Sequence, residues 1–151
     1  MKKNTKFCAP VARRSPVSGG IPSNEPVKAV FGTISPGLLA VMPYEFPGKK
    51  IDIVIETDEF TCLCPWSGLP DFADLKIVYV PEKDVIELKS LKYYLQSFRM
   101  VGIVHESAVN RILSDLSEAV DPISMSVELV FRLRGGIKTT VRAELPGGVS
   151  V

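Results

Sequence analysis

The chain has 151 residues, of which 46% are hydrophobic and 23% charged, and this composition is typical of a single globular domain with its own core. The formal net charge of +1 argues against general binding to a nucleic-acid backbone, and no apolar run approaches the roughly 20 residues that span a bilayer. No apolar segment of a secretory signal follows the basic N-terminus, so we expect a cytoplasmic protein with reduced thiols.

The N-terminal third of the sequence is expected to be irregular. Residues 1–48 are rich in Pro, Gly, Ser and Lys, which favours an arm and lead-in with one short strand near residues 28–31. A folded domain is predicted over residues 49–151, where the hydrophobic pattern becomes regular.

Two strands and two helices follow along the chain. Isoleucines alternate with other residues over 51–56, and LKIVYV at 75–80 is rich in β-branched and aromatic residues, so both segments are predicted strands. The stretch FTCLCPWSGLPDF, residues 60–72, is interpreted as the loop between them. Apolar residues at three- and four-residue steps predict one helix over 88–98 and a second over 105–119.

The last third returns to strands. Alternating apolar residues over 127–133 and 141–145 predict two strands, with a turn at Gly135 and Gly136 between them. The order strand, strand, helix, helix, strand, strand is satisfied by an α+β fold in which two helices cover one face of an antiparallel sheet.

The cysteines of the predicted loop allow several kinds of chemistry. Cys62, Cys64 and His105 could supply three zinc ligands, although the C-x-C spacing is tighter than zinc sites usually have. The same spacing and the odd cysteine count disfavour a disulfide. Cys64, followed by Pro65 in a turn-rich stretch and by the acid Asp71, also fits a nucleophile with a proton donor nearby, and plain packing is the other interpretation.

The segment ELKSLKYY has both a structural and a functional interpretation. Lys89 and Lys92 lie three residues apart and so share a helix face, with Ser90 beside them. Glu87 opens the helix. The two lysines suit phosphate binding near a helix start, and equally a solvated basic face.

The segment HES is also open to two interpretations. His105 and Glu106 begin the second predicted helix. Glu106 is either a first-turn acid that favours the helix, or a carboxylate that accepts two adjacent N–H groups from a guanine-like ring.

Taken in order, these segments resemble the nitrile reductases of queuosine biosynthesis. FTCLCPWSGLPDF is similar to that family's loop pattern F-T-x-x-C-P-x-S/T-G-x-P-D-F, and ELKSLKYY matches its pattern E-S/L-K-S/A-x-K-L/Y-Y/F/W at every position. LQSFRMVGIVHE resembles the stretch that ends in the family's His-Glu pair, and RLRGG resembles its Arg-Gly-Gly turn. The resemblance covers about residues 48–146.

The resemblance implies the tunnelling fold, a four-stranded antiparallel sheet with two helices on one face in the order ββααββ. Subunits of this fold join sheet to sheet into rings, and active sites form between neighbours. We therefore expect a homo-oligomer, a decamer of two facing pentamers.

The resemblance also implies an enzyme, which uses NADPH to reduce the nitrile of 7-cyano-7-deazaguanine to the aminomethyl product on the way to the tRNA base queuosine. Cys64 would attack the nitrile and form a covalent thioimide, and Asp71 would donate a proton to the nitrogen. His105 would act at the nitrile end, either by moving a proton or by orienting the substrate. Cys62 stands where the family pattern is variable and is given no role.

Binding contacts are implied residue by residue. The residues expected to bind the small-molecule substrate are Ile86, Glu87, Leu88, His105 and Glu106. Those expected to bind NADPH are Lys89, Ser90, Lys92 and Arg134, with no metal ligand and no direct nucleic-acid partner. The family pattern permits Ser or Leu at Leu88, so a hydroxyl contact is lost there.

Other functions stay open at this point. A related archaeal transferase uses the same cysteine and aspartate to turn a nitrile carried on tRNA into an amidine for archaeosine synthesis, without NADPH. A zinc hydrolase of the same fold would need more histidines than His105 alone. A non-enzymatic binding module would have no use for Cys64 and Asp71.

Overall fold

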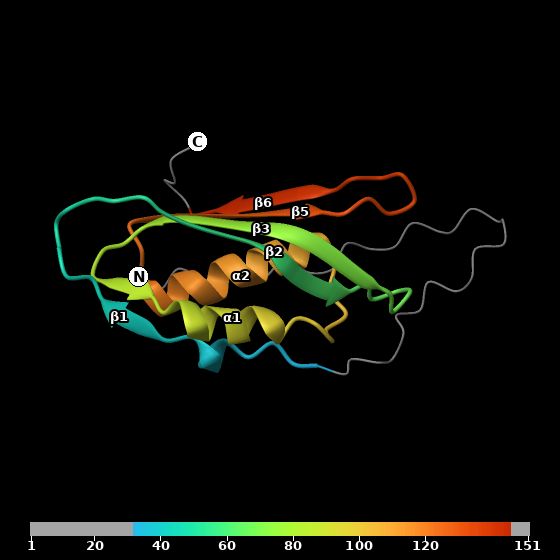
Figure 1. Cartoon of the computed structure of the whole chain (residues 1–151), viewed down its shortest axis with the longest axis horizontal. Coiled ribbons are helices and arrows are strands. Elements are labelled where there is room, and N and C mark those ends of the chain that lie inside the picture. The colour runs from blue at the N-terminus through green and yellow to red at the C-terminus, as the bar shows by residue number, and fades with distance from the viewer. Residues whose placement is uncertain (1–31, 146–151) are drawn as a thin grey trace, which may run out of the picture.

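The structure of the chain, a computed structural model, describes residues 32–145. The strand expected near residues 28–31 lies outside this range. The elements, shown in Figure 1, are η1 (Pro36–Leu38), β1 (Val41–Pro43), β2 (Ile53–Leu63), β3 (Pro70–Val80), β4 (Asp84–Ile86), α1 (Leu88–Gln96), α2 (His105–Val120), β5 (Ser124–Phe131) and β6 (Thr140–Glu144).

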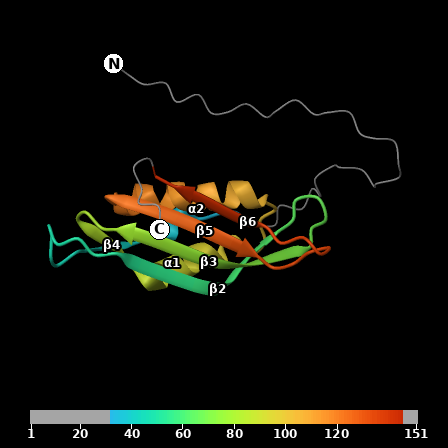
Figure 2. The ribbon, with the colours of Figure 1, turned by 90° about the horizontal axis from the view of Figure 1, so that it is seen from above.

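The four longer strands form one antiparallel sheet in the order β2-β3-β5-β6. Both helices lie against the same face of this sheet, as Figures 1 and 2 show from two directions. The expected α+β class is thereby confirmed. The short strands β1 and β4 pair with each other outside the main sheet, and they were not predicted because three residues are too few for a recognisable period.

The prediction of a loop over residues 60–72 is wrong at both ends. Strand β2 continues to Leu63 and β3 begins at Pro70, so a much shorter loop joins them. Pro70 is tolerated because it is the first residue of its strand, where a missing N–H costs little. A bulge between Thr57 and Phe60 also shifts the alternation of β2, which hides the end of the strand in the sequence.

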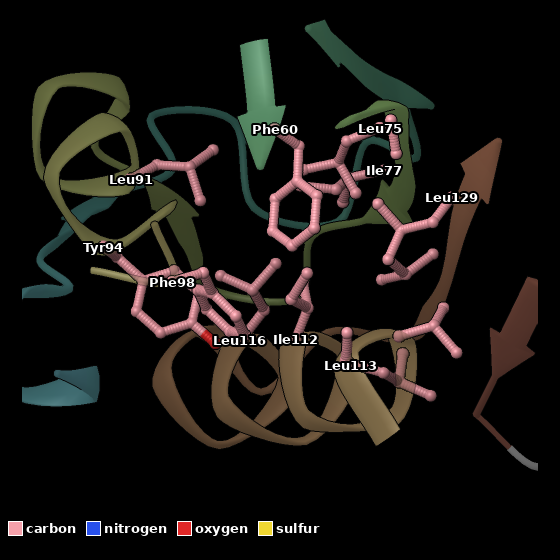
Figure 3. Close-up of a cluster of buried hydrophobic side chains, with 14 of the residues drawn as sticks. Phe60, Leu75, Ile77, Leu91, Tyr94, Phe98, Ile112, Leu113, Leu116 and Leu129 are labelled. Carbon is pink, nitrogen blue, oxygen red and sulfur yellow. The ribbon is translucent and has the colours of Figure 1, made fainter. Parts of the chain in front are cut away.

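The hydrophobic core lies between the sheet and the two helices (Figure 3). Leu129 of β5 and both Ile112 and Leu116 of α2 are fully buried there. Phe98, just after α1, packs on Phe60 of β2 with ring centroids 5.4 Å apart. Full burial of such side chains stabilises the fold by roughly 1.5–3 kcal/mol each, so this core fixes the helices against the sheet.

The helices end where local chemistry requires it. Glu87 caps α1, because its carboxylate accepts the N–H groups of Lys89 and Ser90 at 2.8 and 2.7 Å. Helix α2 ends at Asp121, which has a left-handed conformation with φ of 44°, and Pro122 follows. Within residues 32–145 no helix is both long and apolar enough to cross a membrane.

Candidate active site

Cys64 is the first residue after β2, in a tight loop, residues 64–69, that leads into β3. Its N–H donates to the carbonyl of Leu69 at 2.9 Å, and its own carbonyl accepts the N–H of Gly68 at 2.8 Å. Gly68 has a φ of 67°, which residues with a side chain rarely adopt. These bonds hold the half-buried thiol of Cys64 in a defined position.

The surroundings of Cys64 favour its thiolate. Burial of the thiol acts to raise its pKa, but hydrogen bonds from the Ser67 hydroxyl and from the backbone N–H groups of Ser67 and Trp66 oppose it. The positive charge of Arg134 acts in the same direction as these bonds, and the net result is a pKa below the ordinary value. A lowered pKa increases the thiolate fraction, which is the nucleophilic form.

Cys62 has the opposite character. Its side chain is fully buried in the core, and it pairs with Asp71 across the ladder between β2 and β3. Burial, followed by the charges of Asp71 and Cys64, raises the pKa of Cys62 to about 12. Cys62 is therefore a protonated core residue. The described part of the chain holds no group of three or more His, Cys, Asp or Glu that could bind a metal ion.

Asp71, the second residue of β3, contacts two side chains that are distant in the sequence. Its Oδ1 accepts a hydrogen bond from Arg134 Nη1 at 2.5 Å, and its Oδ2 lies 3.4 Å from His105 Nε2. The imidazole of His105, at the start of α2, stacks on Phe131 with centroids 3.5 Å apart. The carboxylate is nine-tenths buried and ion-paired, so it is held firmly beside the Cys64 loop.

The residues at this end of the sheet form one cluster, the thiol cluster: Cys64, Ser67, Asp71, His105 and Arg134. Glu106 follows His105 in the first turn of α2, and its side chain is exposed to solvent. Of the residues predicted from the sequence, the structure brings together the proposed nucleophile, proton donor and histidine, and adds Arg134, which was expected among the cofactor contacts.

The other predicted contacts gather at the start of α1. Lys89, Lys92 and Leu88 are exposed there, whereas Ile86 is buried. The Ser90 hydroxyl accepts the N–H of Ala40 at 3.0 Å and donates to the carbonyl of Glu87 at 2.7 Å. Ser90 therefore ties the lead-in segment to the helix. The backbone N–H groups of Lys89 and Ser90 hold the pKa of Glu87 below its usual range.

These two groups lie far apart within one chain. Asp71 stands at one end of β3, and Tyr79, eight residues farther along, accepts the N–H of Ile86 at 3.0 Å. At about 3.3 Å per residue Tyr79 lies about 26 Å along β3 from Asp71, so the start of α1 is toward the far end of this strand from the thiol cluster. Figure 2 shows the loop between β2 and β3 toward one end of the molecule and β4 toward the other.

The chain matches the model of a known protein family. A family model described as QueF-like protein matches residues 70–147, more than half of the sequence. The chain belongs to the QueF-like protein family. The matched region includes Asp71, His105 and Arg134 of the thiol cluster.

Individual members of the QueF-like family are close in sequence. A protein of Caldicellulosiruptor bescii named NADPH-dependent 7-cyano-7-deazaguanine reductase is 52% identical over 70% of this chain and 81% of its own length. A protein of the same name from Microcystis aeruginosa is 42% identical over 80% of this chain and 94% of its own. The apo crystal structure of the archaeosine synthase QueF-Like has a TM-score of 0.59 and 24% identity, with 70% of this chain and all of that chain covered. That likeness supports the fold.

Two members of the site in this QueF-like protein were missed by sequence reasoning. Ser67 occupies the Ser/Thr position of the loop pattern, which was the one available signal for it. Phe131 reads as an ordinary core residue of an alternating strand, and nothing in the sequence indicates that His105 stacks on it.

The different environments of the two cysteines lead to a testable difference. We expect Cys62→Ser to retain the activity of the protein and the reactivity of Cys64, because the Cys62 thiol is buried and protonated. Placing a hydroxyl in this apolar position should lower the free energy of unfolding by about 1–3 kcal/mol. Urea unfolding and a rate assay on the same preparation measure both effects. A folded but inactive variant would revive the paired-cysteine and metal interpretations.

Proposed function

We propose that this chain is an NADPH-dependent reductase that converts the nitrile of 7-cyano-7-deazaguanine into a primary amine, in the biosynthesis of the tRNA base queuosine. The close relatives bear the name of this activity, at identities of 52% and 51%. The observation that carries the proposal is a thiol of lowered pKa, Cys64, in a loop that Arg134 joins to the buried carboxylate of Asp71.

Cys64 begins the reaction as the nucleophile. Its sulfur bonds to the nitrile carbon, the triple bond becomes a C=N double bond, and the nitrogen takes up a proton from Asp71, which gives a thioimide. Asp71 needs a proton to do so. The 3.4 Å distance between Asp71 Oδ2 and His105 Nε2 supports His105 as the group that supplies it.

Sulfur suits this reaction because it can leave as well as attack. Bound NADPH would supply a hydride for each of two reductions. Between them the C–S bond breaks, Cys64 departs as a thiolate, and an imine of the substrate is left. The contacts that favour the thiolate also favour this departure. Exclusion of water protects the imine from hydrolysis to an aldehyde.

Binding of the substrate ring is assigned to the first turn of α2. The Glu106 carboxylate is exposed and adjacent to His105, so it is available to accept two N–H groups from the guanine-like edge. Ile86, Glu87 and Leu88 complete the substrate contacts in this proposal. Because Leu88 lacks a hydroxyl, the polar contact there comes from the backbone.

NADPH binding is assigned to the exposed face of α1. Lys89 and Lys92 lie one turn apart, and neither forms an ion pair within residues 32–145. Two cations near the N-terminus of a nine-residue helix suit phosphate groups. The Ser90 hydroxyl is engaged with backbone groups, so a contribution from this residue would come through the helix start that it stabilises.

The distance between α1 and the thiol cluster supports a site shared between subunits. The start of α1 lies beside Tyr79, about 26 Å along β3 from Asp71, so the lysines near it are better placed to serve the Cys64 of a neighbouring chain. Each edge strand of the main sheet, β2 and β6, pairs with one strand and has no further strand on its outer side within residues 32–145, so each is open to another copy. We propose a homo-oligomer, a decamer of two facing pentamers, in which the lysines serve a neighbouring Cys64.

Mixed oligomers test the shared site. Cys64→Ala and a Lys89→Gln/Lys92→Gln double variant should each be inactive or weak alone. Co-expressed at equal levels with two affinity tags, they should recover about a quarter of the wild-type rate, because random mixing gives that share of intact sites. Pairing Cys64→Ala with Asp71→Asn is the matched control and should recover nothing, since both residues belong to one thiol cluster. Equal failure of both mixtures would contradict the shared site.

The function itself is tested by NADPH oxidation with 7-cyano-7-deazaguanine as the only other substrate. Two NADPH consumed per nitrile, with formation of the aminomethyl product, is the expected result, and omission of the nitrile is the control. No oxidation by a folded sample would refute the reductase. An adduct of the nitrile on Cys64 seen by intact mass would then favour an amidine-forming transferase.

A further inference from the structure

The hydroxyl group of Ser67 can both accept and donate hydrogen bonds, and in this way it links Arg134 to the loop of Cys64. The Ser67 Oγ accepts one hydrogen bond from Arg134 Nη2 at 2.9 Å and another from the backbone N–H of Leu69 at 3.3 Å. A hydroxyl has two acceptor positions and one O–H donor. With both acceptor positions filled, the O–H remains for donation, and Ser67, in the same tight loop as Cys64, contributes in this way to the lowered pKa of the Cys64 thiol.

Arg134 binds Asp71, one half of the proposed reacting pair, and Ser67 in the loop that carries the other half, Cys64. One end of its guanidinium, Nη1, donates to Asp71, while the other, Nη2, donates to Ser67. The fork geometry of arginine makes this double contact possible, whereas a lysine presents a single point charge. Arg134 comes from the connection between β5 and β6, so this connection fixes the position of the loop and of β3 together.

The charges around Cys64 explain why this link is needed. Asp71 of β3 pairs with Cys62 across the ladder, and its charge contributes to the raised pKa of that thiol, so a negative charge at this end of the sheet disfavours a thiolate. His105 from α2 faces Asp71 on its other side, and Cys62 from β2 is a buried neutral thiol. Arg134 is the cation that offsets the Asp71 carboxylate at 2.5 Å while it also directs Ser67.

We propose that Ser67 and Arg134 are positioning residues, joined to each other and to Asp71 by hydrogen bonds, that favour the thiolate of Cys64 before any substrate binds. This inference rests on the proposed function for its meaning in catalysis, since Cys64 is the nucleophile there. The sequence predicted Arg134 only as a contact of the NADPH phosphates. The proposal gives it a role in the thiol cluster of its own chain.

The test is the pH dependence of Cys64 alkylation by iodoacetamide in the full-length protein, without nitrile or NADPH. Peptide mass mapping separates Cys64 from the other two cysteines. Ser67→Ala and Arg134→Gln should each move the midpoint of the rate profile to higher pH. The rate constant near pH 7 should fall by about three- to tenfold, and the plateau at high pH should stay unchanged.

Two controls separate this role from a general structural effect. Arg132 lies two residues before Arg134 and pairs with Asp74 at 2.7 Å, so Arg132→Gln removes the same charge from the same connection and should leave the midpoint in place. Ser67→Thr keeps the hydroxyl and should restore the wild-type profile. Unchanged midpoints in the Ser67 and Arg134 variants would overturn the proposal, as would an equal shift in Arg132→Gln or a loss of rate at every pH.

The outcome is independent of the proposed reduction. Alkylation reports the thiolate alone, so the midpoint shifts are expected whether or not NADPH is consumed. If NADPH oxidation fails while the midpoints shift as expected, the proposed function is refuted and the roles of Ser67 and Arg134 in thiolate formation stand.

Discussion

Replacing Cys64 by Ala is expected to abolish nitrile reduction and the covalent adduct together. The reaction depends on an S–C bond that the other thiol within residues 32–145 cannot form, because Cys62 is fully buried and its pKa is raised to about 12. We expect the rate to fall by about a thousandfold or more, as it does when the nucleophile of a covalent mechanism is removed. Stability should change little, because Cys64 lies half-buried in a loop.

Intact mass and NADPH oxidation measure the two effects of Cys64→Ala separately. Wild-type protein mixed with the nitrile alone should gain the mass of one substrate per chain, since addition of the thiol releases nothing. The Cys64→Ala variant should gain none, and Cys62→Ser is the matched control that should behave as wild type. A variant that keeps a tenth of the rate, or still forms an adduct, would rule out Cys64 as the nucleophile.

Asp71→Asn is expected to have the second largest effect. Asparagine has nearly the same shape and keeps an oxygen for Arg134, but it cannot carry the proton that the nitrogen of the nitrile requires. Loss of a positioned proton donor costs about 100- to 10,000-fold. Adduct formation in a single turnover should slow by a comparable factor, since the same proton is needed there.

The matched control for Asp71→Asn lies on the same strand. Asp74 pairs with Arg132 at 2.7 Å, at a more exposed position outside the thiol cluster. Asp74→Asn removes the same charge from β3 and should leave the rate within about twofold, because exposed ion pairs contribute little. If both variants lose activity equally, the effect belongs to the charge of β3 and Asp71 has no special role. Full activity in Asp71→Asn would remove the proton donor from the mechanism.

Regular hydrophobic periods made most of the fold predictable. The alternation in β5 and the apolar stripe of α2 are long enough to identify each element, and both were located within a few residues of their ends. The end of β2 was not predictable, because Cys, Pro and a bulge interrupt its pattern. The three-residue strands β1 and β4 have no period at all, and they form because each pairs with the other.

The candidate site was predictable where its residues lie within motifs. Cys64 and Asp71 are seven residues apart in one loop pattern, and His105 and Glu106 are adjacent, so the order of motifs was enough to nominate them. Their contacts were not predictable. His105 reaches Asp71 from 34 residues away and Arg134 from 63 residues away, and only the packing of α2 and of the β5–β6 connection brings them there.

The sequence by itself determined the family, the α+β class and the identity of the candidate nucleophile, because these depend on local patterns and on the order of motifs along the chain. Only the tertiary structure decided that Arg134 joins Asp71 and Ser67 instead of the lysines of α1. It also decided that the start of α1 lies beside Tyr79, about 26 Å along β3 from Asp71 of the thiol cluster. The physical reason is that hydrogen bonds and charges act over a few ångströms in space, and a residue's neighbours in space are set by strand register and helix packing.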